Sequence, residues 1–117
     1  MSEQIIGKKL SDFLKSNDAG ILKVPQKIFN PYRILILKIL YLHGYADFRE
    51  LKHDLQISDG NLASHLRTLE NEGYINVFKQ IVDRKPRTAY ELTRDGMKAF
   101  EQFRIHVERV IKNDIQK

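Results

Sequence analysis

The sequence predicts a mainly α fold of the α+β class, in which helices surround a single β-hairpin. Three observations support this prediction. Apolar residues recur at helical spacing along most of the chain. The period changes to two between Tyr74 and Leu92, where β-branched and aromatic residues are frequent. Residues that typically start helices stand directly before the helical stretches, at Asn30-Pro31, Asp47, Ser58 and Thr93.

Composition limits the classes of protein that the chain can represent. Its 117 residues suit one domain, with 42% hydrophobic and 30% charged residues. The absence of cysteine excludes disulfide scaffolds and thiolate metal sites, so we expect no metal and no cofactor. The net charge of +5 favours an anionic partner. The longest apolar run, Ile34–Leu42, is too short for a membrane span, and no signal-peptide core follows Met1, so a cytoplasmic protein is expected.

The N-terminal part predicts two helices joined by a packed connector. Glu3–Ser16 has apolar residues at helical spacing, and Ile21–Phe29 contains Pro25, which excludes a regular helix through its middle. Asn30 and Pro31 then provide an N-cap and a first helical residue. The helix Tyr32–Leu42 is apolar nearly all round, which is typical of a central core helix.

A short helix and a longer one follow with only three residues between them. The sequence Asp47-Phe48-Arg49-Glu50 forms a D-x-x-E capping box, and the helix that it starts ends near Gln56. Ser58 caps the second helix, which ends where Gly73 favours a left-handed C-terminal cap. Its inner stripe consists of three leucines: Leu62, Leu66 and Leu69.

A β-hairpin and a long helix complete the chain. Ile75, Val77 and Ile81 alternate with polar and aromatic residues, Asp83–Pro86 is a predicted turn, and Arg87–Leu92 alternates again. Thr93 caps a helix of roughly Arg94 to Asn113. Four of its residues form an a/d heptad seam, which is typical of helix pairing: Phe100, Phe103, Val107 and Val110.

This order of elements is that of a winged helix-turn-helix. The second helix of such a motif lies in the major groove of DNA, which is about 12 Å wide, so its outer face must carry small polar residues. The helix Asp59–Glu72 has this pattern. His65 is interpreted as facing DNA or as a solvated residue, and Asp59 as a helix N-terminal charge or an acceptor for cytosine. The predicted DNA-binding residues here are Ser58, Gly60, Asn61, Ser64, His65, Arg67 and Thr68.

The hairpin supplies the positive charge that this helix lacks. Four basic residues and one acidic residue within residues 79–87 leave a net charge of +3. A basic hairpin tip suits the adjacent minor groove or its phosphates, and Pro86 stiffens it. The predicted DNA contacts of this wing are Lys79, Arg84, Lys85 and Arg87.

The same residues resemble a known family. The stretch SDGNLASHLRTLENEGYI from Ser58 to Ile75, followed by YELTRDG from Tyr90 to Gly96, is similar to the winged helix of the prokaryotic MarR/ArsR-like transcriptional regulators. The resemblance implies a homodimer that binds double-stranded DNA in a sequence-specific way and controls transcription. Cysteine ligands of the ArsR-type metal sensors are absent, and whether a small molecule is sensed stays open.

The domain plan places dimerisation at both ends. Residues 1–30 are expected to form an N-terminal dimerisation segment, 31–93 the DNA-binding winged helix, and 94–117 a C-terminal dimerisation helix. The alternative is a winged helix used only for protein–protein contact. An enzyme is not expected, because no nucleophile–base pair or Gly-rich phosphate loop occurs. The predicted dimerisation residues are Ile6, Leu10, Phe13, Phe100, Phe103, Val107 and Val110.

Overall fold

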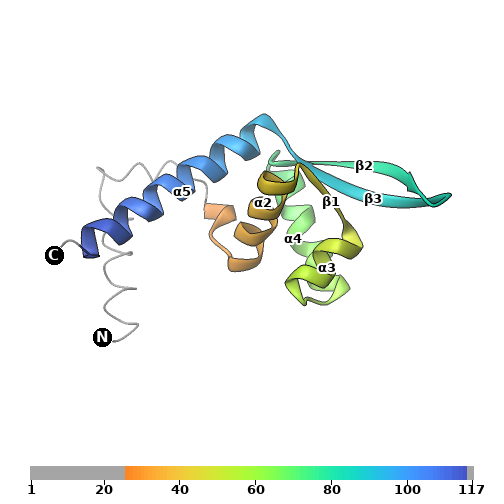
Figure 1. Cartoon of the computed structure of the whole chain (residues 1–117), viewed down its shortest axis with the longest axis horizontal. Helices are drawn as coiled ribbons and strands as arrows, with labels where there is room; N and C mark the ends of the chain where they lie inside the picture. The colour runs from red at the N-terminus through yellow and green to blue at the C-terminus, as the bar shows by residue number, and fades with distance from the viewer. Residues whose placement is uncertain (1–25, 116–117) are drawn as a thin grey trace. The chain divides into compact units, whose positions relative to one another are not determined.

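The structure, a computed structural model, describes residues 26–115, with side chains as far as Lys112. These residues form two compact units, 26–100 and the part of the last helix from Glu101 onward. The predicted helix Glu3–Ser16, with Ile6, Leu10 and Phe13, lies outside the described residues. The described elements are η2 (Gln26–Ile28), α2 (Pro31–His43), β1 (Tyr45–Asp47), α3 (Phe48–Leu55), α4 (Asp59–Asn71), β2 (Ile75–Val82), β3 (Lys85–Leu92) and α5 (Arg94–Ile115) (Figure 1).

Helix α2 packs on the core of the first unit with one side only, because Leu35 is 42% and Leu42 63% exposed, although the sequence predicts a helix buried nearly all round. Asn30 caps it, because its side-chain oxygen accepts hydrogen bonds from the backbone N–H groups of Tyr32 at 2.9 Å and Arg33 at 3.2 Å. Its buried residues are Ile36, Leu37 and Leu40. The predicted connector before α2 contributes η2, whose Ile28 is fully buried. The cap fixes the first turn of α2, and the buried Ile28 packs the segment before it on the core.

The turn between α3 and α4 follows the predicted pattern. The capping box of α3 is present: the backbone N–H of Glu50 donates to Asp47 Oδ1 at 2.8 Å, and that of Asp47 donates to Glu50 Oε1 at 3.3 Å. Gln56 takes the left-handed conformation, with φ 51°, which turns the chain out of α3. Ser58 Oγ then accepts from the backbone N–H of Asn61 at 3.2 Å and starts α4.

The hairpin is tighter than the sequence predicts. Strands β2 and β3 pair antiparallel, with Val82 opposite Lys85, so the turn consists of Asp83 and Arg84 alone. The predicted four-residue turn Asp83–Pro86 is therefore wrong, since Lys85 and Pro86 belong to β3. Both turn residues have positive φ, 52° and 65°, the left-handed conformation that matches the twist of the two strands. Pro86 is tolerated because β1 does not extend to this end of β3.

Strand β1 is not among the elements predicted from the sequence. Its three residues pair antiparallel with β3, Ala46 opposite Tyr90, and complete a sheet of order β1-β3-β2 within the described residues. A strand of three residues carries no usable periodicity, and Asp47 is at once its last residue and the N-cap of α3. The α+β winged helix is confirmed, with a third strand added.

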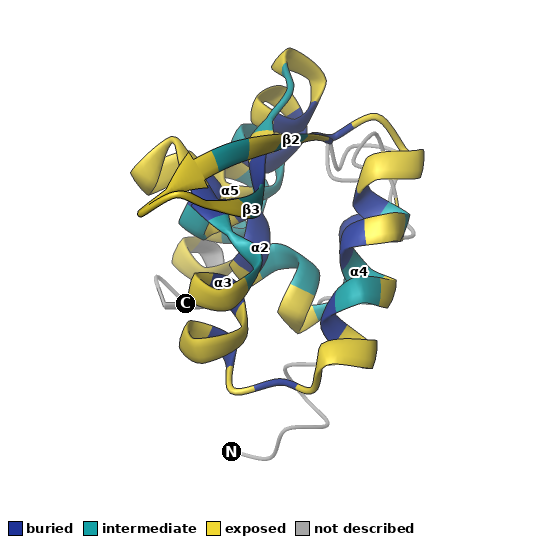
Figure 2. Cartoon of the chain, turned by 90° about the vertical axis from the view of Figure 1, so that its right-hand side faces the viewer, coloured by how far each residue is buried: buried dark blue, intermediate teal, exposed yellow. Residues whose placement is uncertain are grey.

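Much of the hairpin extends beyond the core. Ile75 is buried, whereas Val77 is 38% and Ile81 78% exposed, although the three alternate along one strand. Figure 2 looks along the hairpin and shows its projecting part coloured as exposed. The period of two thus identifies the strand, but burial ends where the helices beneath it end.

Helix α5 begins against the sheet. Thr93 caps it, because its Oγ1 accepts from the backbone N–H of Gly96 at 2.9 Å and donates to the carbonyl of Gly73 at 2.6 Å. Phe100 is buried, with its ring centroid 5.1 Å from that of Tyr41. Phe103, Val107 and Val110 are half-buried. Their part in a dimer, like that of Phe100, stays a prediction.

Candidate nucleic-acid interface

Helix α4 has one apolar side and one polar side. Leu62, Leu66 and Leu69 are buried, with exposures of 0%, 3% and 0%. Figure 2 shows this buried stripe facing the rest of the unit and the opposite side of α4 exposed. Of the residues predicted to bind DNA, the structure leaves five exposed at or near the polar side and two half-buried: Ser58, Gly60, Asn61, Ser64 and Arg67, then His65 and Thr68.

Two of the predicted hydroxyl contacts are already engaged in the helix. Thr68 Oγ1 donates to the backbone carbonyl of Ser64 at 3.1 Å, so its remaining capacity is that of an acceptor. Ser58 Oγ accepts from the backbone N–H of Asn61, which leaves its hydrogen to donate. Ser64 and Asn61 therefore present the more versatile polar side chains on α4.

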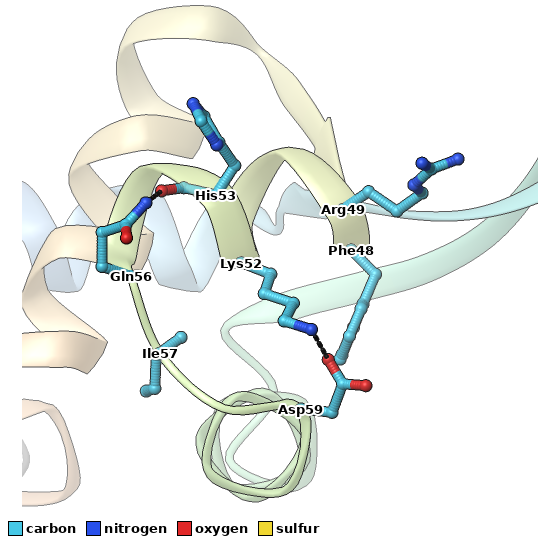
Figure 3. Close-up of a pocket in the computed structure, with 7 residues that line it drawn as sticks. All are labelled: Phe48, Arg49, Lys52, His53, Gln56, Ile57 and Asp59. Carbon is cyan, nitrogen blue, oxygen red and sulfur yellow. Dashed lines mark hydrogen bonds and ion pairs between the residues drawn. The ribbon is translucent and has the colours of Figure 1, made fainter.

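Asp59 at the start of α4 forms an ion pair with α3. Lys52 Nζ lies 2.8 Å from Asp59 Oδ1, and the two side chains are 48% and 70% exposed (Figure 3). Such an exposed pair stabilises the fold by at most about 1 kcal/mol. Its larger effect is electrostatic, because Lys52 offsets a carboxylate that would repel phosphate. The carboxylate also complements the helix dipole at this terminus.

This ion pair borders an open hollow of about 590 Å³ between α3 and the turn. Its lining includes Arg49 and His53, one helical turn apart on α3, and Figure 3 shows both side chains projecting from the helix. These basic residues are not among the DNA contacts predicted from the sequence. The signal was available, because Arg49, Lys52 and His53 follow one another at spacings of three and one on a short helix.

Two residues of α2, Tyr32 and Arg33, hold His65 of α4 in place. We call these three residues the clasp. Arg33 Nε–H donates to His65 Nδ1 at 3.1 Å, and Arg33 Nη1–H donates to the carbonyl of Lys27 at 2.8 Å. The rings of Tyr32 and His65 stack with centroids 5.7 Å apart and 28° between their planes. Burial, and then the positive charge of Arg33, lower the pKa of His65 below its usual value.

The basic residues of the wing are unequal. Arg84 and Lys85 are exposed at the turn, and Arg87 is half-buried opposite Gln80. Lys79 Nζ donates to Thr88 Oγ1 at 2.6 Å across the hairpin. The exposed positive charge of the wing therefore lies on Arg84 and Lys85 at the tip and on Lys79 of β2, which keeps its charge while it donates to Thr88. Ile81, opposite Pro86, adds an exposed apolar side chain near the tip.

Other kinds of site find little support within the part of the chain that the structure describes. No group of three His, Cys, Asp or Glu side chains is placed to hold a metal ion there. Likewise, none of the helices among residues 26–115 combines the length and the apolar composition that crossing a bilayer requires.

The geometry defines a winged helix domain with an exposed polar helix and a basic hairpin tip. The sequence model of one protein family, described as a winged helix DNA-binding domain, matches residues 32–111. The chain belongs to this family. An uncharacterized protein of Methanocaldococcus jannaschii is 35% identical over 88 residues, which cover 74% of this chain and 96% of that protein.

Solved structures agree with this assignment. A transcriptional regulator homologue from Pyrococcus horikoshii is 32% identical, with a TM-score of 0.72 over 91% of this chain and 96% of that one. A MarR-family regulator from Enterococcus faecalis, 19% identical, has a TM-score of 0.68 over 86% of this chain and 93% of its own, which shows the shared fold. The predicted winged helix is confirmed. Family and fold point to transcriptional regulators, which are not enzymes.

Proposed function

We propose that this protein is a cytoplasmic transcriptional regulator that binds double-stranded DNA in a sequence-specific way as a homodimer. The proposal depends on the two different faces of α4. One face is a buried leucine stripe, and the remaining surface of the helix exposes Asn61, Ser64 and Arg67. A helix so fixed to a core fits the major groove, which is about 12 Å wide, against a helix diameter of about 10–12 Å.

In this proposal α4 reads the bases, and the wing and α3 provide most of the electrostatic attraction to DNA. Arg67 is the one lysine or arginine within α4, Asp59–Asn71. The wing tip, with Arg84 and Lys85, contacts the adjacent minor groove or its phosphates. Arg49 and His53 of α3 add contacts to the backbone. Because phosphate neutralisation releases counterions, the affinity must fall steeply with salt.

Dimerisation is proposed through α5 together with the N-terminal segment. The seam residues Phe103, Val107 and Val110 are half-buried, and Ile105 and Ile111 on the same helix are 42% and 51% exposed. A two-fold dimer places its two recognition helices about 34 Å apart, one turn of the duplex, and so matches a pseudo-palindromic site.

The test measures binding of the full chain to a fluorescent random duplex by anisotropy, between about 50 and 200 mM salt. We expect Arg84→Gln/Lys85→Gln to reduce the slope of log affinity against log salt by about two for each protomer, and so by about four for the homodimer. The matched control, Lys38→Gln/Lys98→Gln, removes the same charge from exposed positions on α2 and α5 and leaves the slope unchanged. Wild-type binding that is absent, or that does not respond to salt, would contradict the proposal.

A second candidate is a winged helix that contacts another protein and does not bind DNA. One observation favours it: Ile81 is 78% exposed near the wing tip, beside Pro86, in a position where an apolar side chain suits a protein partner. The same titration separates the candidates. A protein-contact module shows no salt-dependent affinity for duplex, and selection from a random pool then yields no shared site.

A further inference from the structure

His65 lies on the side of α4 that faces α2, between the buried leucine stripe and the fully exposed face of the helix. His65 lies three residues after Leu62 and four before Leu69, so it borders the buried stripe on the side of α2. It is half-buried, whereas Ser64 is exposed. In a helix that lies in the major groove, the outermost line faces base edges, and the side lines face the sugar-phosphate walls.

The hydrogen bond from Arg33 determines what His65 can offer to a ligand. A guanidinium group only donates, so Nδ1 of His65 must accept, and the ring proton is on Nε2. Burial and the charge of Arg33 lower the pKa of His65, which favours this neutral form. Nε2–H is therefore a donor of fixed direction, held by Arg33 on one side and by the stacked ring of Tyr32.

Arg33 retains positive charge and free donors at the same place. Two of its N–H groups donate within the described residues, one to His65 and one to the carbonyl of Lys27. A guanidinium has five such groups, so three remain. A phosphate oxygen accepts hydrogen bonds and carries negative charge, and it matches both the Nε2–H donor and the neighbouring cation.

We propose that the clasp binds a backbone phosphate of duplex DNA, with Nε2–H of His65 donating to a phosphate oxygen and Arg33 supplying charge while it orients the ring. This inference rests on the proposed function and specifies that the predicted DNA contact of His65 is made to a backbone phosphate. Arg33 acts here as a positioning residue as well as a cation.

The experiment compares four variants of the full chain on two duplexes of unrelated sequence. His65→Ala removes the donor, and His65→Gln retains an N–H at similar reach. Arg33→Gln removes both the charge and the support of the ring, whereas Lys38→Gln removes one charge elsewhere on α2. The readouts are affinity, its salt slope, and the titration of the His65 ring followed by NMR in the absence of DNA.

We expect His65→Ala to weaken binding to both duplexes equally, by about threefold to tenfold for one lost neutral hydrogen bond, without a change of salt slope. His65→Gln restores most of this loss. Arg33→Gln lowers the slope by about one for each protomer, and so by about two for the homodimer. It also raises the pKa of His65, because the neutral ring loses its donor and its cationic neighbour. Lys38→Gln changes none of these quantities.

Three results overturn the inference. Loss of affinity confined to one duplex makes His65 a base contact. Unchanged affinity in His65→Ala makes the clasp structural only. A His65 titration in Arg33→Gln identical to that of the wild type removes the positioning role. Failure of the proposed function is distinguishable, because then the wild type binds neither duplex, which overturns both together.

Discussion

Gly96, in the first turn of α5, is a position where the addition of a single methyl group should lower the stability of the fold. A Cβ built on Gly96 would lie 2.0 Å from the carbonyl oxygen of Tyr74 and 2.9 Å from its carbonyl carbon. Both are backbone atoms, so no side chain can rotate away. The same carbonyl accepts the backbone N–H of Thr93 at 3.0 Å, and Gly96 donates to Thr93 Oγ1. Gly96→Ala must therefore displace the start of α5 from the sheet.

The expected cost follows from three contributions, two that destabilise the fold and one that stabilises it. Overpacking costs about 1–3 kcal/mol and a weakened N-cap about 1 kcal/mol, while alanine is favoured over glycine inside a helix by about 1 kcal/mol. We expect a net loss of about 1–3 kcal/mol in the free energy of unfolding, measured by urea denaturation with circular dichroism.

Gly60 is the matched control for this substitution. It also lies in the first turn of a helix, α4, but a Cβ built on it meets no atom within 4 Å. Gly60→Ala should therefore leave stability unchanged or raise it by up to about 1 kcal/mol. If Gly96→Ala were as stable as Gly60→Ala, the close approach of α5 to Tyr74 would not be the constraint that we infer.

Two further predictions concern the charges near the interface. Lys52→Met should weaken duplex binding roughly fivefold to tenfold at 0.1 M salt, because it removes a cation and leaves the charge of Asp59 unpaired. Asp59→Asn should strengthen binding. If anisotropy showed the affinity of both variants shifted in the same direction, this account would be contradicted. The pKa of His65 is lowered by burial and by Arg33, so the folded state binds its proton less readily than the unfolded state. Stability should consequently decrease as the pH falls below the ordinary His value of about 6.5 towards the lower folded-state pKa. His65→Gln should remove part of that slope in urea titrations at several pH values. The remaining part is assigned to His106, whose pKa is lowered by burial and then by Arg109. An unchanged slope in His65→Gln would contradict the prediction.

Local chemistry made the helix boundaries predictable. Asn30, Asp47 and Ser58 each satisfy backbone N–H groups two or three residues ahead, so the signal and the structure that it specifies are neighbours in sequence. The helical period likewise identified the leucine stripe of α4 and the polar side opposite it. These features depend on few residues and on no distant partner.

The features that the sequence did not reveal depend on distant pairing. Strand β1 exists because Ala46 meets Tyr90, far along the chain. His65 joins Arg33 across 32 positions, which converts a residue predicted to be solvent-facing into a half-buried one. Lys52 and Asp59 lie on different helices, and only the angle of the turn brings them together. No periodicity or capping rule contains this information.

The two-residue turn of the hairpin has a consequence for the balance between folding and recognition. Arg84 has φ 65°, a conformation that glycine adopts without the steric cost, roughly 1–2 kcal/mol, that a side chain incurs. The hairpin would fold more readily with glycine there, yet the position holds one of the exposed cations of the wing. Under the proposed function, the backbone conformation at the tip favours glycine, whereas binding to DNA favours a positively charged side chain. The sequence has arginine at this position, which favours binding over folding.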